Sequence, residues 1–434
     1  MKKIVILMLV AMISLPFAAF AQEPSADSES GLGVDTSGAV IADDINVKND
    51  VNNYLADKGW GQGENTNADG TTFFVAVGYG VIQAPRGSSA YIDARRRAFD
   101  KAMLKAKDEL LKYLGTTIST KTEYEYQEGD FPVPGKKENK EPSILDKGKM
   151  LIHAKLDELL KKKGIVPDSE EAKEEVPKIL NSESFRKTIK AVSQSYIAGL
   201  QAWKVFEGSP DGKKGKIGVV AIWSDALNRV ASSIGTNTTP PPGKPKSIIS
   251  SQVPEDKDIL LNTFGVRQTR DENGEYVILA FGQAGASGKS AMAEEMASEK
   301  ANGFAMAYIR EFTGETAKRT QDMHDAETTK ELENGSEVYE DESAMKLAIE
   351  TKARQLSIKG IKTIKNWEAP HPLTGQTVFG SVVAWSPSSA ERAGNMRQRM
   401  QPGAAGEQRI NSASPGSQKG GYSGSGMEGD DEDF

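Results

Sequence analysis

The sequence predicts an α+β protein with two related domains in tandem. Each is expected to be a small, mostly antiparallel sheet with a long alanine-rich helix and a second helix packed on it. Three repeated features predict this fold. A β-type run ending in an aromatic residue and a glycine occurs twice, at Tyr79-Gly80 and at Phe281-Gly282. An alanine-rich helical pattern follows each run, and each unit closes with a strand ending in Trp-Ser.

The first strand is expected over residues 71–82, where apolar side chains occupy both faces, as is typical of a central strand. Ser88 or Ser89 can cap the helix that follows and runs to Leu114. Small residues recur in this helix at steps of four and form a low ridge that lets a helix lie close against a sheet. The matched rows are Ala94, Ala98, Ala102, Ala106, Leu110 and Leu114 in the first unit and Ala293, Ala297, Ala301, Ala305, Ile309 and Thr313 in the second.

After each long helix a glycine, Gly115 or Gly314, is a natural C-terminal stop. We expect each unit to continue with a strand, a second helix and a two-stranded hairpin. In the first unit that strand is the threonine-rich run at 116–123. The second helices are expected at 184–196 and 343–355, and the last hairpin strands at 218–224 and 380–386.

The first unit is longer because of an insertion at 124–184. It contains an amphipathic, lysine-rich helix at 144–163 and a short helix at 169–176 that Ser169 caps and Pro177 stops. The apolar stripe of the first of these helices could dock on a partner. We favour packing against its own domain.

These observations divide the chain into six segments. They are a signal peptide at 1–21, a flexible N-terminal segment with a short helix at 22–70, the first unit at 71–235, a proline-rich linker at 236–255, the second unit at 256–390, and a disordered, acidic-ended tail at 391–434.

The N-terminus has the pattern of a secretory signal. Lys2 and Lys3 precede an apolar run at 4–15, and Ala19-Phe20-Ala21 is an A-x-A site that predicts cleavage after Ala21. The run is too short to span a bilayer. The chain has no cysteine, which excludes disulfides and a lipid anchor on cysteine. We therefore expect a periplasmic or secreted protein of a Gram-negative bacterium, with no membrane span after cleavage.

The charge balance excludes one class of partner. The full chain has 54 basic and 61 acidic residues, and cleavage removes two lysines. An acidic mature chain of this kind is not expected to bind nucleic acid.

A glycine-rich loop at 282–290, ending in Gly288-Lys289-Ser290, has the setting of a phosphate-binding loop between a strand and a helix. Gln283 stands where that motif needs glycine, and the matching loop at 82–89 has no lysine. We interpret the loop as a plain helix start.

Three consecutive arginines at 95–97 could bind an anion or the carboxylates of a partner. The matched positions 294–296 carry Glu-Glu-Met, so the charge is not kept between the units. We favour a solvated helix surface. A salt-bridged contact between the two units is the alternative.

Histidine is scarce, and none of the three residues pairs with another at helical spacing. His153 is expected at the boundary of the inserted helix's apolar stripe. Asp322, His324, Asp325 and Glu327 have metal-ligand chemistry but lie in a polar connector, which favours a solvated loop. No triad or nucleophile elbow stands out around His371 or elsewhere. The sequence thus predicts no catalytic, cofactor-binding or metal-binding residues, and no cofactor.

Aromatic residues are matched between the units. Trp223 pairs with Trp385, and Phe206 with Trp367. Aromatic residues at strand ends usually pack in the core or at its rim, which is our expectation. A groove for a peptide or glycan is the alternative.

The run GYG, the helix ARRRAFDKAMLKAKDELLKYLG and the run TTISTKTE resemble a group of bacterial envelope domains. The group comprises the N-terminal domain of the flagellar T-ring protein and related small surface lipoproteins. The resemblance covers residues 71–123 and 185–228, and more loosely 276–386. It implies an α/β envelope domain used in assembly or surface interaction, without catalytic residues. The chain departs from the group in lacking a lipidated cysteine and in its insertion.

The sequence therefore favours a non-enzymatic exported protein that acts as an interaction or assembly module. Its partner would be another envelope protein or a second copy of the chain. The alternative is a periplasmic hydrolase or a small-ligand-binding protein that uses a cleft between the two units.

Overall fold

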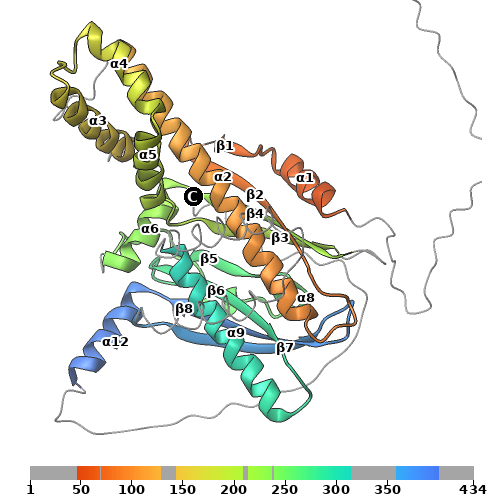
Figure 1. Ribbon diagram of the computed structural model, residues 1–434. Coiled ribbons are helices and arrows are strands. Elements are labelled where there is room, and N and C mark those ends of the chain that lie inside the picture. The colour runs from red at the N-terminus through yellow and green to blue at the C-terminus, as the bar shows by residue number, and fades with distance from the viewer. Residues whose placement is uncertain are drawn as a thin grey trace, which may run out of the picture.

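The computed structural model describes residues 46–68, 70–128, 143–208, 214–236, 239–313 and 358–399. Within them the chain forms two four-stranded antiparallel sheets with helices packed on them (Figure 1). This arrangement confirms the predicted α+β fold with two tandem units. The expected signal peptide, Gly314, the expected helix at 343–355 and the tail beyond residue 399 lie outside the described residues.

The strands follow the same spatial order in both sheets, β1-β2-β4-β3 and β5-β6-β8-β7. The first strand, expected to be central, is central as β2, and β6 takes the same place in the second sheet. The strands are β1 (Gly63–Thr66), β2 (Thr72–Val81), β3 (Gln201–Gly208) and β4 (Lys216–Trp223) in the first sheet, and β5 (Gly265–Arg270), β6 (Tyr276–Gly285), β7 (Lys362–Pro370) and β8 (Thr377–Trp385) in the second.

The helices differ in length between the units. They are α1 (Val47–Lys58), α2 (Tyr91–Glu128), α3 (Ile144–Lys162), α4 (Glu170–Asn181), α5 (Glu183–Ser195) and α6 (Asp225–Thr236) in the first unit, then α7 (Ile249–Gln252), α8 (Lys257–Leu261), α9 (Ala291–Phe312) and α12 (Pro387–Arg399).

The strand register corrects the alignment of the two units. Trp223 faces Phe74 and Trp385 faces Ile278, so four residues further along Gly78 is equivalent to Gly282. The sequence pairing of Gly80 with Gly282 was wrong by two residues. Both Gly78 and Gly80 lie under the helix, and only the hydrogen-bonded register of the strands shows which of them is equivalent to Gly282.

The alanine ridge packs on this glycine in both units. A Cβ at Gly78 would overlap the backbone carbonyl of Ala102, and one at Gly282 would overlap that of Ala301. The helix rows were therefore matched correctly, with Ala102 equivalent to Ala301. Such close approach of backbone to backbone requires glycine on the strand and alanine on the helix.

The Trp-Ser pairs mark a second repeated device. Ser224 accepts a hydrogen bond from the backbone of Leu227, and Ser386 accepts one from that of Ser389, so each serine caps the helix after its strand. Gly199 and Gly360 have φ of 92° and 87°, and their backbones approach these first turns closely. The matched glycines thus reflect a shared geometry.

Helix α2 does not end at Gly115, and the strand expected at 116–123 is helical. The prediction was wrong because the insertion gives the extra turns a surface to bury. Ile118, Thr122 and Tyr126 recur at steps of four and are buried. Gly115 lies close to α5, where a Cβ would be 3.5 Å from the hydroxyl of Ser193.

Helix α4 also continues past its expected stop, since Pro177 lies inside it. A proline has no N–H for the carbonyl four residues earlier, that of Lys173. The side-chain amide of Gln127 on α2 donates to this carbonyl at 2.8 Å. The tail prediction is likewise wrong for residues 391–399, which belong to α12.

Two strands were missed. Each lies before the long helix of its unit, where β1 pairs with β2 and β5 with β6. The strand expected after the second long helix lies outside the described residues. The helices expected at 144–163 and 184–196 are confirmed as α3 and α5. The proline-rich segment joins the units along the β5–β6 turn, where Gly243 donates to the carbonyl of Gly274 at 2.8 Å.

One hydrophobic core runs through both units, with Phe99 of α2 in contact with Phe264 and Tyr308 of the second unit. A second cluster joins α3, α4, α5 and the C-terminal part of α2. We refer to these four segments (residues 115–128 and 144–195) as the helical arm. The arm projects from the two-sheet body at the upper left of Figure 1.

Candidate functional site

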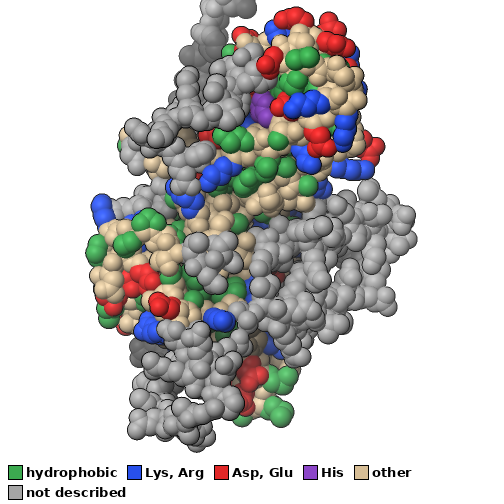
Figure 2. Space-filling model, turned by 90° about the vertical axis from the view of Figure 1, so that its left-hand side faces the viewer, with side chains coloured by type: hydrophobic (Ala, Val, Ile, Leu, Met, Phe, Trp, Pro, Cys, Tyr) green, Lys and Arg blue, Asp and Glu red, His purple; other side chains and the backbone are tan. Residues whose placement is uncertain are grey.

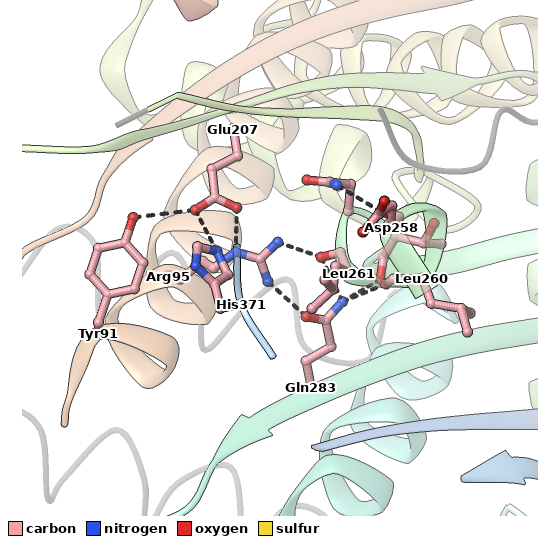
Figure 3. Close-up of polar contacts among 10 residues, drawn as sticks. Tyr91, Arg95, Glu207, Asp258, Leu260, Leu261, Gln283 and His371 are labelled. Carbon is pink, nitrogen blue, oxygen red and sulfur yellow. Dashed lines mark hydrogen bonds and ion pairs between the residues drawn. The ribbon is translucent and has the colours of Figure 1, made fainter. Parts of the chain in front are cut away.

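A group of buried polar side chains lies where the two units meet (Figure 3). At its centre is Arg95 of α2, which has no exposed surface. Its guanidinium pairs with the Glu207 carboxylate of β3 and donates to the Leu261 carbonyl and, at 2.7 Å, to the Gln283 side-chain oxygen. Arg95 therefore links its own unit to the second one. We call Tyr91, Arg95, Glu207, Gln283 and His371 the junction cluster.

Glu207 is held on three sides. Besides Arg95, the Tyr91 hydroxyl donates to it at 3.3 Å, and Nε2 of His371 lies 3.3 Å from the same oxygen. Burial of this side chain, which is 2% exposed, acts to raise its pKa. Arg95 and His371 outweigh that effect and hold the pKa of Glu207 at about 2. The carboxylate is thus ionised at neutral pH.

Gln283 fixes the second unit's side of the cluster. Its amide nitrogen donates to the backbone carbonyls of Leu260, Leu261 and Thr263 at 2.9, 3.1 and 2.9 Å. These carbonyls lie at and just after the end of α8. The residue that departs from the phosphate-loop motif is therefore a buried structural amide.

Apolar side chains fill the space around the junction cluster. The rings of Phe99 and Phe264 stack at a centroid distance of 5.0 Å, and the guanidinium of Arg95 lies 4.7 Å from the Phe264 centroid. A Cβ at Gly265 would be 2.9 Å from the Phe99 ring. At these residues the boundary between the units is close-packed.

Helices α2 and α9 make further contacts across the boundary. Asp100 accepts from the Tyr308 hydroxyl at 2.9 Å, and Lys107 pairs with Glu311 at 3.1 Å. Arg96 pairs with Asp100 and lies 4.0 Å from the centroid of Phe304. The favoured prediction of a solvated arginine surface is wrong for Arg95 and Arg96. The alternative, a salt-bridged contact between the units, is correct as to the contact, which Arg95 makes by hydrogen bonds to Gln283 and Leu261. The ion pairs of the two arginines, with Glu207 and Asp100, lie within the first unit.

The glycine-rich loop behaves as a helix start. The Ser290 side chain accepts from the backbone of Ala293 and caps α9. Lys289 is exposed at the end of this loop.

The two described histidines are both buried. His153 on α3 is 7% exposed, stacks on Tyr126 and lies 2.6 Å from the Glu125 carboxylate, which also pairs with Lys149. It therefore helps to join α3 to α2 inside the helical arm. His371 belongs to the junction cluster. His324 and the acidic residues around it lie outside the described residues.

The matched aromatic residues are packing residues, as expected. Trp223 and Trp385 are each 4% exposed, and their indole nitrogens donate to the carbonyls of Ala198 and Lys359. Trp367 is 9% exposed. Phe206 is half-buried and packs edge to face on Tyr54.

The helical arm buries the apolar stripe that the sequence marked as a possible docking face. Ile152, Leu156 and Leu160 of α3 are fully buried in its cluster. Figure 2, which views the molecule from the side of the arm, shows hydrophobic side chains scattered among charged ones. Exposed apolar residues of the arm are Tyr124, Met150, Leu151 and Val166.

The described part of the chain has neither a metal-binding cluster nor a membrane-spanning helix. In those residues no group of three or more histidine, aspartate or glutamate side chains is placed to hold a metal ion. No helix there has the length and apolar character needed to cross a membrane.

Comparison with known proteins gives one family match. A family model described as a domain of unknown function (DUF6844) matches residues 142–236, which include α3 to α6 and the β3–β4 hairpin. Among solved structures, the hypothetical protein FTT1539c from Francisella tularensis is similar with 22% identity and a TM-score of 0.45, over 78% of this chain and 89% of that one. No curated protein matches.

Sequence reasoning missed four of the five residues of the junction cluster. Two signals pointed toward them. Gln283 is a polar residue inside an otherwise apolar strand, and Glu207 has a counterpart, Glu368, at the equivalent place in β7. Neither signal indicates which partner the side chain meets, because the partners come from distant segments.

Proposed function

We propose that this chain is a non-enzymatic exported protein that acts as an interaction or assembly module of the bacterial envelope. The observation that carries the proposal is the junction cluster, where buried charged and polar side chains join the two units. A reactive site needs titratable groups that reach a substrate. Here Arg95 and Glu207 are buried and bonded to each other.

Glu207 illustrates the argument. A general acid must carry a proton near working pH, but a carboxylate with a pKa of about 2 does not. A nucleophile or base must contact a substrate, but this side chain is 2% exposed, is bonded to Arg95 and Tyr91, and lies 3.3 Å from Nε2 of His371. Its chemistry suits a fixed ion pair.

The packing at the boundary supports the same proposal. The rival functions, a hydrolase or a small-ligand-binding protein, both use a cleft between the units. Phe99, Phe264 and Tyr308 occupy the boundary and are buried against one another. A large shared interface favours a rigid body that presents outer surfaces to partners.

The place of action rests on the sequence. The lysines at 2 and 3, the apolar run and the Ala19-Phe20-Ala21 site are the basis for export to the periplasm or beyond. The resemblance to T-ring and surface-lipoprotein domains adds assembly as the role. Fractionation of cells expressing the full chain with a C-terminal tag tests export: a shortened chain in the periplasm or medium supports it, and a full-length cytoplasmic chain contradicts it.

The catalytic alternative is tested with the mature chain from Gln22. We expect no turnover on panels of peptide, ester and glycoside substrates, and no thermal shift above the control with a metabolite library. Turnover that a single carboxylate substitution abolishes would contradict the proposal. A saturable shift with one metabolite, lost on substitution of a boundary residue, would establish a ligand-binding protein instead.

A further inference from the structure

The first turns of α9 carry the two most exposed methionines described, Met292 and Met296, which are 73% and 50% exposed. They are one turn apart and therefore lie on one face of the helix. Exposed acidic residues flank them, namely Glu294, Glu295 and Glu299. We call these five residues the α9 face.

The equivalent turns of α2 are covered. Because Ala102 is equivalent to Ala301, Asp93 corresponds to Met292, Arg95 to Glu294 and Arg96 to Glu295. In α2 the second unit seals this face. Ile92 lies against Gly285, whose added Cβ would be 3.0 Å away, and Asp93 accepts from the Gly285 backbone at 3.2 Å. The α9 face is therefore equivalent to the α2 surface that packs against the second unit, but the α9 face is exposed.

The interface between the units is head to tail. The first unit contributes α2 and the edge strand β3, and the second contributes its opposite edge, β5, with the end of α8. The edges lie side by side, where the Gln201 side chain accepts from the backbone of Gln268 at 2.9 Å. Such a heterologous contact uses different surfaces of two similar modules.

Both halves of this interface recur at the outer ends of the molecule. Strand β7 is equivalent to β3, with a register shift at the same place, between Thr363 and Lys365 as between Ala202 and Lys204. Strand β1 is equivalent to β5, since each pairs with the outer side of the central strand. The α9 and β7 surfaces of the second unit are thus equivalent to the α2–β3 half of the interface. The α1–β1 end of the first unit is equivalent to the half formed by β5 and the end of α8, and we call it the receiving half.

Charge on the receiving half suits the α9 face. Tyr79 is the counterpart of Gln283, and the ammonium of Lys48 lies 5.7 Å from its ring centroid. Trp60 precedes β1 as Phe264 precedes β5, and the ammonium of Lys58 lies 5.8 Å from its ring centroid. At the interface between the units α2 contributes Arg95, whereas the equivalent residue of α9 is Glu294. Lys48 and Lys58 on the receiving half carry the opposite charge to Glu294.

We propose that the α9 face docks on the α1–β1 end of a second copy of this chain, repeating between molecules the head-to-tail contact between the units. This inference deepens and rests on the proposed assembly function, since it names the partner. A heterologous contact leaves one free half at each end. Copies therefore add in series to form an open chain or, where the rotation closes, a ring.

Sedimentation velocity of the full mature chain tests the proposal, from about 1 µM to about 100 µM at low salt. We expect the sedimentation coefficient to rise with concentration. The double variant Met292→Arg, Met296→Arg should weaken association at least about tenfold, whereas Leu151→Arg on the helical arm should leave it unchanged. Unchanged circular dichroism melts establish that the variants fold.

A charge exchange identifies the docking partner. Glu294→Lys and Lys48→Glu should each weaken self-association. A mixture of the two variants should associate again, because the reversed α9 face of one variant meets the reversed receiving half of the other, and their unchanged halves also pair opposite charges. A wild-type chain that stays monomeric, or association that ignores Met292 and Met296, overturns the inference. The proposed function fails by a different result, namely substrate turnover.

Discussion

Helices α2 and α9 begin as copies of one element but end in different environments. Both lie on a glycine of the central strand through an alanine, Ala102 or Ala301. The first turns of α2 are buried under the second unit, whereas those of α9 are exposed. The side chains changed accordingly, from arginines bonded across an interface to glutamates on a surface. The packing of a helix on its own sheet thus fixes the alanine and glycine positions, whereas the neighbouring unit determines which side chains occupy the outward-facing positions.

The far ends of the two helices differ as well. Helix α9 stops at Phe312, but α2 continues through Gly115 to Glu128. The extra turns of α2 exist because α3, α4 and α5 offer an apolar surface, which Ile118 and Tyr126 bury. One helix therefore serves both the two-sheet body and the helical arm.

The largest expected difference between the helices is at the arginine. Arg95→Met leaves the Glu207 carboxylate buried without its main partner, which should cost about 3–5 kcal/mol of unfolding free energy. The matched change Glu294→Met on α9 removes an exposed charge and should change stability by less than about 0.5 kcal/mol. Urea unfolding measures both. Equal losses would mean that the two turns are not in different environments.

A second difference concerns pH. The pKa of Glu207 lies below its ordinary value of 4.5, at about 2, so its ion pair stabilises the folded state above pH 4.5. That contribution, about 3 kcal/mol, is lost as pH falls through 2. Glu207→Gln should flatten the decline of stability over this window. Glu368→Gln, at the exposed equivalent place in β7, should leave the decline intact, and the opposite pattern would contradict the assignment.

The packing of the alanine-rich helix on the central strand, which both units share, is tested at Gly78 and Gly282. Gly78→Ala and Gly282→Ala each force a Cβ into the backbone of the helix above, and each should destabilise by about 1–3 kcal/mol. Gly303→Ala in α9 has open space and should instead gain up to about 1 kcal/mol from helix propensity. If the two strand glycines differ widely, the units do not pack alike.

The smallest expected effect concerns the C-terminal end of α2, where Gln127 contacts α4. Gln127→Ala removes the donor to the Lys173 carbonyl opposite Pro177 and should cost about 0.5–1 kcal/mol. In a Pro177→Ala background the helix supplies its own N–H to that carbonyl. The cost of Gln127→Ala should then fall toward zero, as a double-mutant cycle in urea would measure. An unchanged cost would place the role of Gln127 elsewhere.

Local patterns predicted most of the elements. The apolar faces of β2, the alanine row of α2 and the serine before α4 each depend on a few neighbouring residues, and each led to a correct element. The errors share a cause. Gly115 and Pro177 stop isolated helices, but here α5 and Gln127 compensate for them from distant parts of the chain.

The junction cluster depended on distant contacts even more strongly. Arg95, Glu207 and Gln283 come from α2, β3 and β6, and His371 follows β7, so the complete cluster forms only when the two units are packed together. The sequence showed the charge inversion between 95–97 and 294–296. Such a difference between equivalent positions indicates that one of the two copies lies in an interface. It did not indicate which copy was covered.

Because the chain has no cysteine, single cysteines can report the central comparison. Ile92→Cys and Ala291→Cys place a thiol at equivalent positions of α2 and α9, one 2% exposed and the other exposed. In dilute native protein we expect Ala291→Cys to react with a thiol reagent nearly as fast as in urea. Ile92→Cys should react at least about 100-fold more slowly. Equal native rates would contradict the account that one copy of this helix face is sealed and the other is open.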